Sequence, residues 1–390
     1  MYPTGMPAAP QSEGWSPLAG VRAVDFSMFV PGPFCSSILA DLGAEVIKVE
    51  APGGDPGRSY IPAQFRMENR NKRSLALDLK APASASIVER LARRTDVVIE
   101  GFRPGVARRL GIDAEALAKH NGRLICCSIS GYGQTGPWRE RPGHDVNYVA
   151  AAGGLAHPGQ WLKRPARSAL AIADMGGGSF AAIAILAALN ERARTGRGVR
   201  LDLSLFEAAF FWSAMRHGLD PGADPRAHIF PVNDVFETKD GKRLTLGILE
   251  EHFWRNFLKL APGLDREEFG TDAKRRENGD ALSAMLAEEM KSRTGDEWLK
   301  LLEEHDVPVD PCLTPAQAAE LEQIRIREDV ATAGGERFAL FPVHADGRRG
   351  GRLRRGVPKL GEHAREILVE LGFDDAEIAG MVKSGAVRTG

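Results

Sequence analysis

Strands and helices alternate over the first third of this sequence. A short strand is predicted at Val21–Phe26 and a helix at Phe34–Leu42, and Gly43 ends this helix before a second strand at Glu45–Glu50. The same patterns predict strands at 74–79, 97–100 and 124–129 and a helix at 85–94. Strands that are separated by single helices form a parallel sheet covered by those helices. We therefore expect an α/β fold.

The composition restricts the class of partner. The 390 residues include 51 basic and 52 acidic side chains, and this balance argues against nucleic acid or an anionic membrane as the main partner. The longest apolar run, Phe180–Leu189, is about half as long as a membrane span, so we expect a buried helix there. No cysteine pair has C-x-x-C spacing, which predicts no metal site and favours a reducing, cytoplasmic setting; the four are Cys35, Cys126, Cys127 and Cys312.

A carboxylate and an imidazole are candidates for acid–base chemistry. Asp174 stands just before Gly176–Gly178 and the apolar run, so we expect it at a helix N-terminus, where negative charge is stabilised. The glycines would let a ligand approach with no Cβ in the way. His144, upstream between Gly143 and Asp145, offers a second proton-transfer group. The alternative is structural, because aspartate is a preferred helix N-cap.

The segment Gly131–Gly136 matches the G-x-G-x-x-G pattern and follows a predicted strand. Pro137 comes next, however, and the residues after it cannot open a helix for a pyrophosphate. The first strand–helix turn, residues 29–33, also lacks three spaced glycines. We therefore reject a dinucleotide-dependent dehydrogenase and interpret 131–136 as a glycine-rich active-site loop.

Basic side chains recur near the ends of the predicted strands. Cations at the ends of parallel strands are typical of sites for anionic ligands, here a polyphosphate. For any single residue, a solvated surface position is the alternative. The set comprises Arg58, Arg70, Lys72, Arg73, Lys80, Arg103, Arg108 and Arg109.

Between Leu18 and Val387, the sequence contains a series of motifs that resemble, in the same order, those of the family III CoA-transferase and α-methylacyl-CoA racemase superfamily. The motifs are Leu18–Asp25, Asp41–Glu50, Asn71–Leu79, Gly101–Gly105, Gly131–Pro137, Thr195–Gly198 and Lys359–His363. It is most similar to the racemase branch, because Gly143–Tyr148 contains the histidine that formate and oxalate transferases lack. The glycine-rich lid loop of those transferases is also missing.

The resemblance implies a large Rossmann-like α/β domain, a smaller second domain and an interlocked homodimer. Residues 1–17 are expected to be a disordered lead-in. The large CoA-binding domain would take residues 18–215, the linker and small domain 216–330, and the return to the large domain 331–390. Within the small domain, a hairpin with an Asp-Gly turn is predicted at 234–246, with helices at 253–260, 280–291 and 294–305. Helices are also predicted at 206–216, 362–371 and 375–382, and a loop at 348–355.

The resemblance also implies the ligand and the roles of single residues. The ligand would be an acyl-CoA thioester, with no cofactor beyond CoA and no metal. His144 and Asp174 would be the proton carriers, with Glu250 acting from the small domain. Supporting residues would be Asp145, Asn147, Tyr148 and Gly176. The CoA-binding set would be Phe29, Arg58, Arg73, Leu77, Lys80, Gly101, Phe102, Arg103 and Arg109.

Two departures from the family pattern are visible. Ala51 stands where several relatives have a CoA-contacting arginine, so Arg58 or Arg73 would have to replace it. Glu250 is followed by Glu251 where racemases often have proline, and either could be a solvated acid at a helix start.

These features predict a cofactor-independent 2-methylacyl-CoA racemase. His144 and Asp174 would exchange the α-proton, and backbone N–H groups of residues 175–177 would stabilise the enolate oxygen. Asp145 is a candidate to hold the imidazole. The first alternative is a CoA-transferase that forms an acyl anhydride on Asp174. The second is a CoA-binding protein without catalysis.

Overall fold

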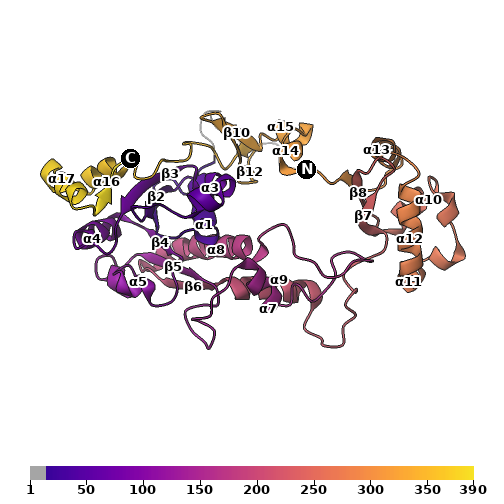
Figure 1. Ribbon diagram of the computed structural model, residues 1–390, viewed down its shortest axis with the longest axis horizontal. Coiled ribbons are helices and arrows are strands. Elements are labelled where there is room, and N and C mark those ends of the chain that lie inside the picture. The colour runs from indigo at the N-terminus through magenta and orange to yellow at the C-terminus, as the bar shows by residue number, and fades with distance from the viewer. Residues whose placement is uncertain (1–14) are drawn as a thin grey trace. The chain divides into compact units, whose positions relative to one another are not determined.

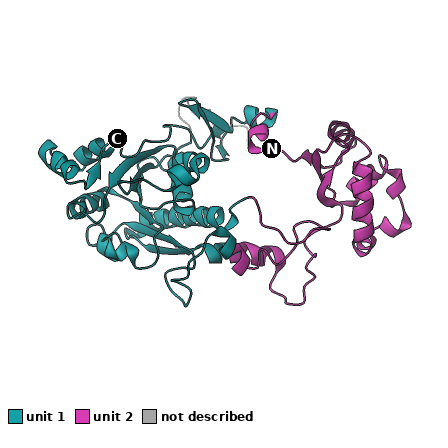
Figure 2. Ribbon diagram, viewed as in Figure 1, with its two compact units in different colours: residues 1–148, 170–209, 322–390 teal, residues 149–169, 210–321 magenta. Residues whose placement is uncertain are grey.

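The structure is a computed structural model that describes residues 15–390 and divides into two compact units. Unit 1 contains residues up to 148, 170–209 and 322–390, and unit 2 contains 149–169 and 210–321 (Figure 2). The expected boundaries differ from this division in three places: residues 149–169 and 210–215 group with unit 2, and the return begins at 322. The disordered lead-in expected at 1–17 lies largely outside the described residues, and Trp15 forms a bridge with Gly350.

Unit 1 is built on a seven-stranded sheet in the order β14-β3-β2-β1-β4-β5-β6 (Figure 1). The strands are β1 Arg22–Asp25, β2 Glu45–Glu50, β3 Lys72–Leu77, β4 Val97–Glu100, β5 Ile125–Ser130, β6 Arg200–Ser204 and β14 Val387–Arg388. β1 to β6 are parallel, and β14 pairs antiparallel with β3. The order 3-2-1-4-5-6 is that of doubly wound dinucleotide-binding folds. The expected α/β fold is confirmed.

Helices pack on the strands of this sheet. One core joins β1, β3 and β4 to α4 Ser84–Arg94, α16 Ala364–Glu370 and α17 Asp375–Lys383 through buried aliphatic side chains. α1 Pro31–Asp41 and α8 Ile172–Thr195 contact each other, and α8 also contacts β5 and β6. By length and apolarity, α8 is the one described helix that could cross a membrane, although its contacts with β5, β6 and α1 are those of a core helix.

Glycines in α8 allow this close packing. A Cβ on Gly178 would lie 2.7 Å from the carbonyl oxygen of Pro31 in α1, and a Cβ on Gly177 would clash with Leu205. α8 begins at Ile172, so the glycines lie inside the helix. The expectation that they make room for a ligand is therefore wrong for Gly177 and Gly178, which make room for neighbouring chain segments.

The remaining elements of unit 1 connect these layers. They are α2 Gly57–Tyr60, α3 Pro62–Asn69, α5 Val106–Arg109, α6 Ala114–Ala118, α15 Glu322–Ile326 and the hairpins β10 Val330–Ala333/β11 Glu336–Ala339 and β12 His344–Ala345/β13 Arg348–Arg349. β13 lies where a loop was expected at 348–355. The side chain of Asn71 donates to the Arg352 carbonyl and accepts from the N–H groups of Arg354 and Arg355, which ties the returning chain to the start of β3.

Unit 2 contains the predicted hairpin and helices. β7 Asn233–Glu237, β8 Arg243–Gly247 and β9 Val309–Pro311 form an antiparallel sheet. Its helices include α10 Glu251–Leu258, α11 Asp272–Glu277, α12 Gly279–Met290 and α13 Gly295–Glu304, and η1 Pro262–Leu264, η2 Glu267–Phe269 and α14 Pro315–Ala318 complete it. The core is formed by Trp254, Phe257, Leu286 and Trp298, which are almost fully buried. Two further helices, α7 Asp145–Ala151 and α9 Leu205–His217, lie where the chain passes between the units.

Candidate active site

A pocket opens at the carboxyl ends of β1, β2 and β3, next to β4. In doubly wound sheets, ligands bind at this edge, where the strand order reverses between β1 and β4. Its lining is mainly apolar and includes one cation: Phe26, Met28, Ala51, Leu77, Leu79, Lys80, Phe102 and Leu110. The pocket therefore brings together three residues of the expected CoA-binding set, Leu77, Lys80 and Phe102.

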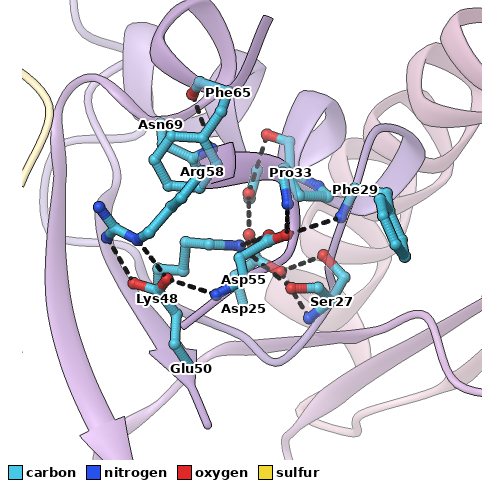
Figure 3. A network of polar contacts seen from close by, with 12 residues as sticks. Asp25, Ser27, Phe29, Pro33, Lys48, Glu50, Asp55, Arg58, Phe65 and Asn69 are labelled. Carbon is cyan, nitrogen blue, oxygen red and sulfur yellow. Dashed lines mark hydrogen bonds and ion pairs between the residues drawn. The ribbon is translucent and has the colours of Figure 1, made fainter. Parts of the chain in front are cut away.

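A buried polar network beside this pocket holds the loop after β1 (Figure 3). The Lys48 ammonium donates to the Ser27 carbonyl at 3.1 Å and pairs with Asp55 at 2.9 Å. The Asp25 carboxylate accepts from the Ser27 N–H and pairs with the Lys72 ammonium at 3.2 Å. Asp25, Lys48 and Lys72 are completely buried. Each charge in this interior is matched by an opposite charge and hydrogen bonds, as buried ions require.

Two arginines expected to bind CoA have protein partners instead. Arg58 donates to both carboxylate oxygens of Glu50 at 2.8 Å and to the Pro358 carbonyl. Arg73 lies near the amino end of β3, away from the pocket edge, and donates to the Glu366 and Glu370 carboxylates. The structure therefore corrects the expectation for Arg73 and gives Arg58 a structural partner. Arg73 therefore does not replace the arginine missing at Ala51.

The loops after β1 and β4 carry the other expected CoA ligands. Phe29 has a positive φ of 61°, and its N–H donates to the Asp55 carboxylate. Its ring is exposed. Gly101, Phe102 and Arg103 follow β4 directly, and the Phe102 N–H donates to the Glu100 carboxylate at 2.9 Å. Arg109 ends α5 and is exposed.

The carboxylate of Asp145, the residue after His144, contacts the start of α8 next to Asp174. Asp145, in the first turn of α7, accepts hydrogen bonds from the N–H groups of Ala173 at 2.8 Å and Asp174 at 3.4 Å. Asp145 thus caps α8, which corrects the expectation that it holds the imidazole. The exposed His144 directly precedes α7, and its N–H donates to the Asn147 side chain at 3.0 Å.

The carboxyl of Asp174 has a raised pKa. Burial, and after it the negative charge of Asp145, raise the pKa of Asp174 to about 7. A group with a pKa near the working pH is suited to both giving and taking protons. The expected enolate donors are not available as predicted, since the Met175 N–H donates to the Ala171 carbonyl within the helix. Gly176 is buried in the same turn.

Tyr148 packs beside this pair. Its hydroxyl donates to the Gly143 carbonyl at 2.5 Å. Burial, and secondly the charge of Asp174, raise the pKa of Tyr148 to about 12, so it stays protonated at physiological pH. Glu250 belongs to unit 2, where it is exposed and precedes α10, whereas Glu251 pairs with Arg275 at 2.6 Å.

Sequence reasoning missed two features of the site. The pairing of Lys72 with Asp25 joins residues that are 47 positions apart, and nothing in the local pattern signals it. The capping of α8 by Asp145 joins residues 28 positions apart. Among residues 15–390, no group of three or more His, Cys, Asp or Glu is arranged to hold a metal ion.

Comparisons with known proteins agree with this architecture. The sequence profile of CoA-transferase family III matches residues 18–364. The chain is 34% identical to the acetyl-CoA:oxalate CoA-transferase of Acetobacter aceti, over 95% of this chain and 99% of that protein. It is 33% identical to the α-methylacyl-CoA racemase of Mus musculus, over 93% of this chain and 95% of that protein.

A solved structure is similar over almost the same length. The crystal structure of a CAIB/BAIF family protein from Brucella suis superimposes with a TM-score of 0.81 at 31% sequence identity, covering 92% of this chain and all of that one. Both sequence and fold therefore lead to one conclusion: the chain is an enzyme that belongs to CoA-transferase family III.

Proposed function

We propose that this enzyme racemises 2-methylacyl-CoA thioesters by removing the α-proton and returning one to the opposite face. The observation that carries the proposal is the placement of His144 and Asp174 at the N-termini of α7 and α8, joined through the Asp145 carboxylate. Inversion at an acidic carbon requires a base on one face and an acid on the other, and His144 and Asp174 are proposed to take these two places.

The proposed reaction removes one proton from the substrate and returns one proton to it. One carrier takes the α-proton and leaves an enolate, and the other, already protonated, delivers its proton to the opposite face of the carbon. With a pKa of about 7, Asp174 is available in both protonation states at neutral pH, which supports a reaction that runs in both directions. Glu250 is proposed as a third, supporting acid from unit 2.

CoA is proposed to bind at the carboxyl edge of the sheet. The supporting observations are the apolar pocket with Leu77, Phe102 and Lys80 and the exposed cations Arg103 and Arg109 on the segment after β4. No cofactor beyond CoA is needed for this chemistry. An acyl-CoA is thus the proposed small-molecule partner.

We also propose a homodimer in a cytoplasmic setting. α9 exposes Phe210, Phe211 and Met215, an apolar set that a second copy of the chain would cover. A molar mass of one chain in light scattering would contradict the dimer.

The second candidate function is a CoA-transferase that uses Asp174 as a nucleophile. The 34% identity to an acetyl-CoA:oxalate CoA-transferase favours it. In that reaction the carboxylate attacks the thioester carbonyl, CoA leaves as the thiolate, and an acyl–aspartyl anhydride forms. The α-hydrogen takes no part.

Solvent exchange separates the two functions. A 2-methylacyl-CoA incubated with the enzyme in D₂O, without an acceptor acid, is expected to gain one α-deuterium and to lose its optical purity, as followed by mass spectrometry and chiral chromatography. The reason is that a proton carrier equilibrates with solvent. Asp174→Asn serves as the negative control. If instead hydroxylamine traps Asp174 as a hydroxamate and no deuterium enters the substrate, the enzyme is a transferase.

Removing the charge of Asp145 is expected to move the pH dependence of racemisation. In Asp145→Asn, the pKa of Asp174 should fall below about 7, because the second cause of its elevation is gone while burial, the larger cause, remains. The amide oxygen can still cap α8. For the enantiomer from which Asp174 removes the proton, the acid limb of the kcat/KM profile should therefore shift to lower pH, with little change in stability. An acid limb that does not move would show that Asp174 is not the group that titrates.

A further inference from the structure

The ring of Tyr148 lies between two glycines at the two ends of the loop that joins β5 to α7. A Cβ on Gly131, directly after β5, would lie 2.6 Å from the Tyr148 hydroxyl oxygen, and a Cβ on Gly143 would lie 2.7 Å from its Cε1 atom. Both distances are too short for real contacts, so any side chain at either position would displace the ring. We call Gly131 and Gly143 the glycine cradle of Tyr148.

The cradle explains the glycine pattern that resembles a nucleotide-binding motif. Gly131 is needed for the Tyr148 ring, whereas Gly133 and Gly136 have φ angles of +85° and +82°, which side chains rarely tolerate. The motif thus shapes a loop that leaves β5 and returns at Gly143. There the Tyr148 hydroxyl donates to the Gly143 carbonyl at 2.5 Å.

Other aromatic side chains hold the Tyr148 ring in this place. Tyr132 meets it edge-on with ring centroids 5.2 Å apart, and Trp138 meets Tyr132 at 5.5 Å. The Arg141 guanidinium lies 4.9 Å from the Trp138 ring. Tyr132 and Tyr148 are both buried. Tyr148 therefore has one position, and through its hydroxyl it holds the peptide that links Gly143 to His144.

We propose that Tyr148 is a positioning residue that holds the backbone of His144 so that the imidazole faces the reacting carbon beside Asp174. This inference rests on the proposed function. Tyr148 carries no proton in the reaction, because its hydroxyl remains protonated across the working pH range. A displacement of about 1 Å at a reacting group can cost on the order of 10²-fold in rate, so one hydrogen bond at this peptide is enough to matter.

The test compares two tyrosine-to-phenylalanine variants of the full-length enzyme. Tyr148→Phe removes the hydroxyl that donates to Gly143. Tyr132→Phe is the matched control, since the Tyr132 hydroxyl is buried and has no hydrogen-bond partner among the described residues. We expect Tyr148→Phe to lower kcat for α-proton exchange by roughly 10–100-fold with KM and the shape of the pH profile unchanged. Tyr132→Phe should keep wild-type kcat and an equal or higher Tm.

A readout that does not need activity separates this inference from the proposed function. With ¹³C-labelled histidine, the His144 ring signal, assigned through His144→Gln, should shift or broaden in Tyr148→Phe and stay in place in Tyr132→Phe. An unmoved His144 signal, or wild-type kcat in Tyr148→Phe, overturns the positioning role. A pH profile that loses one of its limbs in Tyr148→Phe also overturns it, because the residue would then transfer protons. If wild-type enzyme exchanges no α-proton but the His144 signal shifts as expected, the proposed function fails and the positioning stands.

Discussion

Replacing His144 by alanine is expected to slow racemisation of a 2-methylacyl-CoA by about 10²–10⁴-fold, the usual contribution of a general acid or base. The imidazole is exposed at the start of α7, and no described hydrogen bond holds its ring, so its loss should leave the fold intact. The pocket at the carboxyl ends of β1 to β3 is built from other residues, so the affinity for CoA should not change. Chiral analysis of the product and calorimetric binding of CoA measure the two effects separately.

The matched control is His120→Ala. His120 lies before the amino end of β5, and its Nδ1 atom is 3.7 Å from a carboxylate oxygen of Glu89. The rate of this variant should stay within about twofold of wild type, since it touches no part of the site. A His144→Ala enzyme that racemises at close to the wild-type rate would remove His144 from the mechanism. A His144→Ala enzyme that transfers CoA between acids at the wild-type rate would favour the transferase function.

Replacing Lys72 by methionine is expected to lower the free energy of unfolding by about 3–5 kcal/mol, the usual cost of removing one partner from a buried ion pair. The Lys72 ammonium donates to Asp25 at 3.2 Å and to the Pro33 carbonyl and the Asn69 side chain at 2.9 Å each. Methionine fills a similar volume but leaves the Asp25 carboxylate without its nearest cation, in an interior closed to water. Urea unfolding monitored by tryptophan fluorescence measures the loss.

Arg22→Met provides the comparison for an exposed pair. Arg22 is on the same strand as Asp25 and pairs with Glu45 at 3.4 Å, but both side chains are more than half exposed. Such pairs contribute about 0–1 kcal/mol, so the midpoint of unfolding should hardly move. Equal losses in the two variants would show that the buried network does not hold unit 1 together.

Local patterns were enough to predict β1 to β5 of the sheet and the position of Asp174, but not β6 or β14. Apolar runs ended by glycine or by a charged residue identify β1, α1 and β2 because the periodicity of buried side chains along each element is visible in its own residues. Asp174 lies in the first turn of α8, as its place before an apolar run predicts. The resemblance to a family then supplied candidate roles, which local physics could not.

The two arginines Arg58 and Arg73 show where such patterns stop. They look alike in the sequence, since each precedes or follows a predicted strand. Arg58 pairs with Glu50, eight positions before it, and also donates to the Pro358 carbonyl, whereas Arg73 pairs with Glu366 and Glu370, almost 300 positions further along the chain. Whether a cation meets a ligand or a protein carboxylate depends on contacts that only the folded chain creates.

The antiparallel pairing of β14 with β3 has a consequence for how the chain is made. Val387 pairs with Leu77, so the outer edge of β3 stays open until another 310 residues have left the ribosome. At about 5–20 residues per second, that interval lasts roughly 15–60 s. An open strand edge is a template for pairing with other chains. During this time unit 2, whose two segments lie in the sequence between the three segments of unit 1, can already fold, while the nascent unit 1 depends on chaperones or on dilution to remain unaggregated.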